Sequence, residues 1–143
     1  MLQIIQKEQE IADLFLNDTA QGEWIIKLDK TDYEAASNHS KPTIAVKAED
    51  DKSLAELSAI AFDEIKKTGC EPTSLIVMVT FRQDDELMMM EMGEFNDCLS
   101  AYIDNNTDFK WAVQSVSDMP YKRRITIIGF TKKKQKLESR KLC

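Results

Sequence analysis

The spacing of apolar residues along the chain predicts one domain in which helices and strands alternate. Residues 4–16 are apolar at helical spacing and predict a helix that breaks at 17–19, and residues 24–28 read as a short extended stretch. The polar residues 29–41 predict a loop or a frayed helix. Strands are expected at 43–47, 75–79, 109–113 and 124–128. Residues 75–79 are apolar at every position, which is typical of a central strand covered on both faces.

Two helices are expected between these strands. Ser53 and Glu56 form a capping-box pattern before an apolar face, and Gly69 supplies the expected helix stop. Phe95, Cys98, Leu99, Tyr102 and Ile103 recur at helical spacing and define the second helix. This order predicts an α+β fold with a four-stranded mixed sheet, two right-handed crossover helices packed on it and an N-terminal helix. The short last link should pair the final two strands antiparallel.

Length and composition favour one globular domain. The chain has 143 residues, 43% of them hydrophobic and 31% charged. No apolar run is long enough to span a bilayer, and the first residues become charged too soon for a signal peptide. Cys70, Cys98 and Cys143 are odd in number without Cys-x-x-Cys spacing, which argues against disulfides or a zinc site and predicts a cytoplasmic location.

Charge is unevenly distributed along the chain. Six basic residues against Glu138 give residues 131–143 a net charge of roughly +5, so the rest carries roughly −11 of the total of −6. An acidic body of this kind argues against nucleic acid as a partner. The basic tail is interpreted as a solvated chain end, with contact to an anionic surface or a partner as the alternative.

Candidate chemistry is sparse. The four glycines are scattered, so no phosphate-binding loop can form, and His39 is the only histidine. We therefore expect no cofactor, no metal and no self-sufficient active site. The chain has two clusters of acidic residues, Asp29 with Asp32 and Asp84-Asp85-Glu86. Carboxylates of this kind can orient water or hold a hard cation. Solvated turn residues are the interpretation favoured for both groups.

Several sulfur-containing and aromatic residues have two interpretations. Met88, Met89, Met90 and Met92 precede the second helix, and packing at its entry is favoured over a pliable partner-binding surface. Trp24 and Trp111 are expected to anchor the core, with an interface as the alternative for Trp24. Cys98, on the inner face of its helix, is expected to be a buried, inert thiol.

The order of elements together with particular residues resembles the C-terminal half of the FtsZ/tubulin family. The stretches that carry the resemblance are Glu94-Phe95-Asn96-Asp97, residues 107–112, the Asp118-Met119 turn, residues 124–130 and, upstream, residues 22–33. It covers about residues 5–131. It implies an FtsZ C-terminal-like domain at 1–131, with an N-terminal helix and turn at 1–21 and a loop region at 22–41, followed by the basic tail at 132–143.

The resemblance also implies a role for the loop at 22–33. In this family the C-terminal half carries a loop that completes the GTPase site of the next subunit, whose nucleotide lies in an N-terminal half with a glycine-rich loop. Asp29 and Asp32 match the two aspartates of that loop, and Lys27 replaces its asparagine. A lysine there either contacts phosphate as a point charge or marks a site that has lost its activity.

Three functions compete on these grounds. The leading hypothesis is a non-enzymatic interaction domain that docks on FtsZ or a related filament in bacterial cell division and caps it, tunes it or recruits to it. The alternative is a small-molecule-binding α/β domain of unrelated function. The third is an enzyme with carboxylate chemistry at Asp29 and Asp32, for which the chain offers no supporting histidine or activated cysteine. Sequence alone fixes no oligomeric state.

Overall fold

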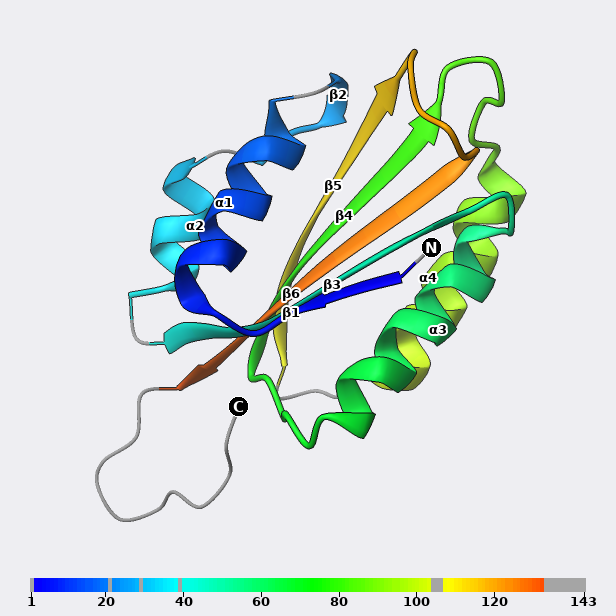
Figure 1. The fold of residues 1–143 in the computed structure, drawn as a ribbon. Coiled ribbons are helices and arrows are strands. Elements are labelled where there is room, and N and C mark those ends of the chain that lie inside the picture. The colour runs from blue at the N-terminus through cyan, green and yellow to red at the C-terminus, as the bar shows by residue number, and fades with distance from the viewer. Residues whose placement is uncertain (1, 21, 29, 39, 104–106, 133–143) are drawn as a thin grey trace.

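The computed structural model describes residues 2–20, 22–28, 30–38, 40–103 and 107–132. Within these residues the chain forms one six-stranded mixed sheet with two helices on each face (Figure 1). The strands are β1 (Leu2–Ile5), β2 (Glu23–Ile26), β3 (Ser40–Asp50), β4 (Ser74–Arg82), β5 (Asp108–Val116) and β6 (Arg123–Lys132). The helices are α1 (Glu8–Thr19), α2 (Lys30–Ala36), α3 (Leu54–Lys67) and α4 (Met89–Tyr102). No helix of this part of the chain is long and apolar enough to cross a membrane.

The sheet is wider than the sequence predicts. Its strand order is β1-β3-β6-β4-β5-β2, so the expected four strands form the centre and two four-residue strands are added at the edges. The α+β class and the mixed sheet are confirmed, whereas the strand count of four is wrong. A four-residue edge strand is too short to show a clear apolar periodicity. It forms because it pairs with the neighbouring strand.

Strand direction follows the expectation for the crossovers but not for the last link. β4 and β5 are parallel neighbours, and β3 and β4 are both antiparallel to β6 and therefore parallel to each other. The predicted pair of β5 with β6 does not form. Instead β6 lies between β3 and β4 and pairs antiparallel with the apolar strand on each side. That position buries Ile125, Ile127 and Ile128 completely.

The two faces of the sheet support separate apolar layers. On one face α3 and α4 pack over alternate residues of the central strands, such as Val77 and Val79. On the other face α1 packs over the intervening residues, such as Ile76 and Met78. Figure 1 shows α1 and α2 on one side of the sheet and α3 and α4 on the other. The prediction that residues 75–79 form a strand covered on both faces is confirmed.

Helix α3 begins and ends as its sequence predicts. The Ser53 hydroxyl accepts from the Glu56 amide at 3.3 Å, and the Glu56 carboxylate accepts from the Ser53 amide at 3.2 Å. This reciprocal pair is the predicted capping box. Gly69 follows the helix with a φ of 81°, a left-handed conformation that glycine adopts without strain.

The N-terminal region differs from its prediction. Residues 2–5 form β1, because Leu2 and Ile4 pair with the edge of β3, and the helix starts only at Glu8. The helix also continues through the expected break to Thr19. There the buried Asp18 accepts from the Thr126 hydroxyl at 2.6 Å, so a residue that reads as a helix breaker is held by the sheet. The polar region after β2 contains the two-turn helix α2.

Candidate functional site

Of the three loop residues predicted from the family resemblance, the structure describes Lys27 and Asp32. Lys27 is exposed directly after β2, and Asp29 lies outside the described residues. Asp32 lies in α2, and its carboxylate accepts from the Lys110 ammonium of β5 at 3.3 Å. The structure therefore ties Asp32 to the sheet, and the role predicted for the three residues stays a prediction.

The second carboxylate group is a turn, as its favoured interpretation predicts. Asp84 accepts from the Arg82 guanidinium at 2.6 Å, and this hydrogen bond raises the pKa of Arg82. Asp85 pairs with Lys122 and Arg123, each at 3.5 Å. In the described part of the chain no three His, Cys, Asp or Glu side chains come close enough to hold a metal ion.

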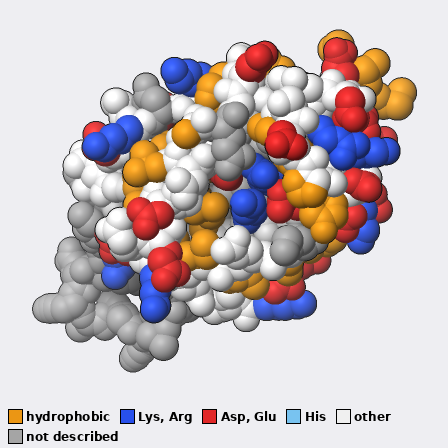
Figure 2. All heavy atoms as spheres, turned by 45° about the horizontal axis from the view of Figure 1, so that its top comes forward, with side chains coloured by type: hydrophobic (Ala, Val, Ile, Leu, Met, Phe, Trp, Pro, Cys, Tyr) orange, Lys and Arg blue, Asp and Glu red, His pale blue; other side chains and the backbone are white. Residues whose placement is uncertain are grey.

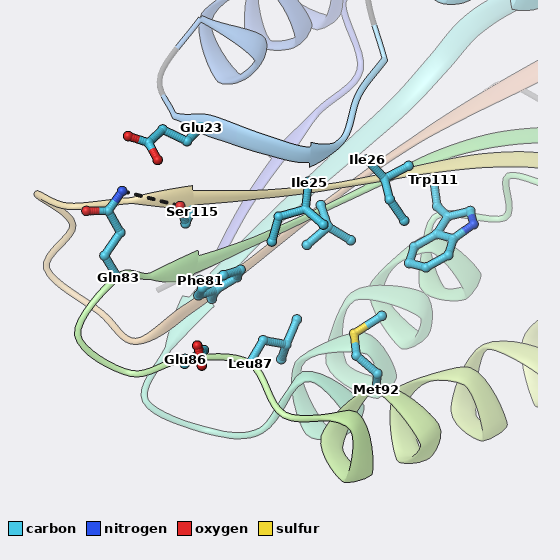
Figure 3. A pocket seen from close by; sticks show the side chains of 11 residues that line it. Glu23, Ile25, Ile26, Phe81, Gln83, Glu86, Leu87, Met92, Trp111 and Ser115 are labelled. Atoms are coloured by element: carbon cyan, nitrogen blue, oxygen red, sulfur yellow. Dashed lines mark hydrogen bonds between the residues drawn. The ribbon is translucent and has the colours of Figure 1, made fainter.

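An apolar groove lies beside the end of β2. Its larger part is a cavity of about 600 Å³ between β2, β5 and the connection from β4 into α4 (Figure 3). A second cavity of about 410 Å³ shares Met92 and Trp111 with it and continues along α4 toward Phe109. We call the two together the β5–α4 groove. Its lining residues are Glu23, Ile25, Ile26, Phe81, Gln83, Glu86, Leu87, Met89, Met92, Gly93, Phe95, Asn96, Leu99, Phe109, Trp111, Val113 and Ser115.

A β-bulge in β2 builds one wall of the groove. The pairing of β2 with β5 shifts register between Trp24 and Ile26. Trp24 packs on the α1 face and donates its indole N–H to the Thr19 carbonyl at 3.2 Å, while Ile25 and Ile26 both line the groove. In a regular strand two consecutive side chains face opposite ways, so the bulge lets both isoleucines reach one surface (Figure 3).

A partly buried ion pair holds the first turn of α4, which forms the opposite wall. Arg123 of β6 donates from Nε and Nη2 to the two carboxylate oxygens of Glu91, both at 2.9 Å. The same carboxylate accepts from the Leu54 amide at 3.0 Å, so α4 starts against the start of α3. The Arg123 hydrogen bonds lower the pKa of Glu91. These hydrogen bonds of Glu91 therefore hold in place the wall of the groove that α4 forms.

The methionines before and within α4 are exposed. Met88, Met89 and Met90 are 62%, 89% and 79% exposed, and only Met92 packs against the core. The prediction that this group packs at a helix entry is wrong for the first three, because α4 already begins at Met89 and the side chains of Met88, Met89 and Met90 stay largely exposed there. Figure 2 shows hydrophobic side chains at the right-hand edge of the molecule, next to acidic ones.

Other candidates occupy positions close to those expected. Trp24 and Trp111 are half-buried and pack on opposite layers, so both are core residues, and Trp111 also lines the groove. Cys98 is only partly buried; its thiol donates to the Ala55 carbonyl at 3.5 Å, and burial raises its pKa, which keeps the thiol protonated. His39, Cys143 and residues 133–143 of the basic tail lie outside the described residues.

The groove residues are the part that sequence reasoning missed. Ile25 and Phe109 are 65% and 42% exposed, yet both sit in segments that read as ordinary short strands. The alternation at 108–114 places Phe109, Trp111 and Val113 on one apolar face of β5, but it carries no signal that the helices leave this face partly uncovered. Charged residues among the groove lining are Glu23 and Glu86, both exposed carboxylates.

A mixed sheet between two helical layers, with a helical crossover into each of two parallel strands, defines the fold class. The solved structures that share it include two of FtsZ from M. jannaschii. An empty FtsZ dimer matches with a TM-score of 0.54 and 18% identity over 90% of this chain, and a single-site FtsZ mutant with 0.50 and 16% over 87%. The predicted resemblance to the FtsZ C-terminal domain is thereby confirmed for the fold.

The match has a limited extent. This chain spans 44% of each of the two FtsZ chains, less than half of their length. No protein-family model matches the sequence, and no curated protein matches it. The comparison therefore establishes an architecture shared with part of FtsZ, and function has to be argued from the groove.

Proposed function

We propose that this domain is a non-enzymatic interaction module that acts by docking on a protein partner, an FtsZ-type filament in the cytoplasm of a bacterial cell being the first candidate. The FtsZ-like fold supports the choice of partner. The sequence offers no glycine-rich phosphate-binding loop, which supports a role without catalysis. The domain would cap, tune or recruit to the filament during division.

The observation that carries the proposal is the exposed apolar lining of the β5–α4 groove. Ile25, Met89 and Phe109 are large side chains that a monomer gains nothing by exposing, and they surround a concave surface. Methionine side chains repack easily against different partners. A protein surface of this composition is typical of an interaction site.

Filament sedimentation and phosphate release test the proposal. Purified domain in excess over FtsZ and GTP should sediment with the filaments and change the rate of phosphate release. Ile25→Asp should abolish both effects, because it places a charge in the groove wall. Leu16→Asp is the matched control, since Leu16 is 48% exposed but lies on α1, on the opposite face of the sheet. Absence of any effect of the unsubstituted domain would contradict the filament proposal.

A small-molecule-binding function is the second candidate, and the size of the larger cavity favours it. A volume of about 600 Å³ falls in the usual range for ligand pockets. A ligand that binds only the native state raises the melting temperature, so a thermal-shift screen detects it. A hit whose shift disappears in Ile25→Asp, together with an inactive filament assay, would favour this function over docking.

Carboxylate catalysis is the third candidate, and its test is direct. Metal-dependent hydrolysis by the purified domain that is lost in the Asp29→Ala, Asp32→Ala double variant would support it. Hydrolysis that survives the double substitution would eliminate it. Asp32 enters this test already paired with Lys110.

A further inference from the structure

We propose that the β5–α4 groove binds an amphipathic helix with basic flanks, supplied by the partner protein and lying along β5 as a third helix of the α3/α4 layer. The inference rests on the proposed function in one respect, that the domain acts by binding a protein. It adds the shape, length and charge of the bound segment.

The layer beside α4 has room for one more helix. Neighbouring strands lie about 4.8 Å apart and packed helices about 8–10 Å apart, so one helix covers about two strands. α3 packs on β3 and β6, and α4 packs beside α3. On this face β5 and β2 keep exposed apolar residues, Phe109 and Ile25, in the position that the next helix of the layer would cover.

The length of the groove sets the length of the bound helix. The groove follows β5 from Phe109 to Ser115, a rise of about 20 Å at about 3.4 Å per residue. A helix rises about 1.5 Å per residue, so about 14 residues fit. Apolar side chains at i, i+3, i+4 and i+7 would face Trp111 of β5 and Met92 of the α4 wall.

Charge complementarity selects the polar face of the helix. The groove lining carries the carboxylates of Glu23 and Glu86 at one end. The turn before Glu86 holds two more acidic residues, Asp84 and Asp85. Their carboxylates are paired with Arg82, Lys122 and Arg123. Outside residues 131–143 the chain has a net charge of roughly −11. Lysine or arginine flanks would be attracted, and an acidic helix would be repelled.

The sequence of residues 133–143 lacks the apolar stripe that such a helix needs. Its leucines, Leu137 and Leu142, are five positions apart, which is not the spacing of a helical stripe. Moreover, β6 leads into the tail at Lys132, opposite Ser40, whereas the acidic end of the groove lies at Ser115 and Glu23. Figure 1 shows the end of β6 and the strand β2 at opposite ends of the sheet.

Peptide titration tests the inference with a defined probe. The probe is a synthetic 14-residue peptide with leucines at i, i+3, i+4 and i+7 and lysines elsewhere. A Trp24→Phe background leaves Trp111 as the only tryptophan, so its emission reports groove occupancy. We expect saturable binding that weakens with added salt. A scrambled peptide of the same composition should bind at least ten-fold more weakly, and a leucine–glutamate peptide should not bind.

Variants connect the binding to the groove. Ile25→Lys should weaken binding at least ten-fold, because it removes apolar contact and repels the lysines. Leu16→Lys, on the other face of the sheet, should leave it unchanged. No saturable binding, equal binding of the scrambled peptide, or full binding by Ile25→Lys would overturn the inference. If filament co-sedimentation still depends on Ile25 in that case, the proposed function survives and only the helical occupant is wrong.

Two other occupants are outcomes of the same experiment. Removal of residues 133–143 that by itself shifts Trp111 emission and tightens peptide binding would identify the tail as occupant. Concentration-dependent dimerisation that Ile25→Lys abolishes would identify a second copy. Either result would overturn the assignment to a partner helix, whereas a monomer with unchanged emission after tail removal supports it.

Discussion

At the scale of single residues, the ion pair of Arg123 with Glu91 is expected to contribute to stability. The Arg123 side chain is 6% exposed and that of Glu91 19%, so the pair is shielded from solvent. It also carries the hydrogen bond to the Leu54 amide, which joins the starts of two helices. Removing one partner of a shielded pair leaves the other charge without compensation.

Glu91→Gln should lower the free energy of unfolding by about 2–4 kcal/mol at neutral pH. The pKa of Glu91 is lowered in the folded state, so its contribution is present above the ordinary value of 4.5 and is lost as pH falls below it. Urea unfolding at several pH values should show the gap between variant and parent closing in acid. Asp84→Asn, in a turn whose carboxylate is 70% exposed, should change the midpoint little. An acid-independent gap would contradict the pairing.

The contribution of Tyr33 to stability should depend on pH in the alkaline range. Its ring packs against Phe15 and Phe130 at centroid distances of 4.8 and 5.4 Å, and its hydroxyl has no hydrogen-bond partner among the described residues. Burial, with a smaller effect of Glu8, raises its pKa to about 12. Because the pKa of Tyr33 is higher in the folded state, its contribution to the free energy of unfolding is complete below pH 10.0. This contribution is lost as the pH rises toward 12.

Tyr33→Phe should therefore remove this alkaline loss and leave stability at neutral pH unchanged or slightly higher. Ultraviolet absorbance titration of the parent should show one tyrosine ionising well above the ordinary range, and that component should be missing in the variant. Ionisation of every tyrosine near 10.0 would contradict the burial of Tyr33.

At the scale of elements, glycine decides whether β2 can dock. A Cβ at Gly22 would overlap the backbone oxygen of Ser115, so only glycine allows the chain to approach β5 there. Gly93 lies in α4, where a Cβ meets nothing within 4 Å. The two glycines therefore make a matched pair, one beside each wall of the groove.

Gly22→Ala should displace β2 and weaken groove binding, with faster hydrogen exchange confined to 23–26. Gly93→Ala should stabilise α4 by about 0.5–1 kcal/mol and leave exchange in β2 unchanged. Exchange mapped residue by residue separates the two outcomes. Unchanged protection of β2 in Gly22→Ala would show that the close approach is not required.

The elements that sequence predicts well are those with their own local signals. The capping box fixed the start of α3, and continuous apolar residues identified β4. β1 and β2 were missed or only partly seen because four-residue edge strands depend on the partner strand. The start of α4 was misplaced because Met89 is helical through the Arg123–Glu91 contact, which joins residues far apart in sequence. The groove was not predictable, since it depends on which strands the helices leave uncovered.

At the scale of the whole molecule, one sheet serves both apolar layers. Trp24 packs in the layer of α1, and Trp111 packs in the layer of α3 and α4. Every central strand contributes alternate residues to both layers. Unfolding of one layer would therefore disrupt the strands on which the other layer packs. The molecule should behave as one cooperative unit.

The two tryptophans test this cooperativity separately. Trp24→Phe and Trp111→Phe each leave one reporter, and in each variant fluorescence and circular dichroism should give the same urea midpoint. Loss of one layer before the other would instead appear as a fluorescence midpoint below that of circular dichroism in one variant.

The position of β6 governs how the chain can be assembled during synthesis. The strand nearest the C-terminus in the described chain lies in the middle of the sheet, between β3 and β4. A nascent chain must therefore hold two incomplete half-sheets, with open apolar edges, until residues 123–132 leave the ribosome. Truncated products that stop before Arg123 would lack the strand that joins the halves, and aggregation or proteolysis would be their expected fate.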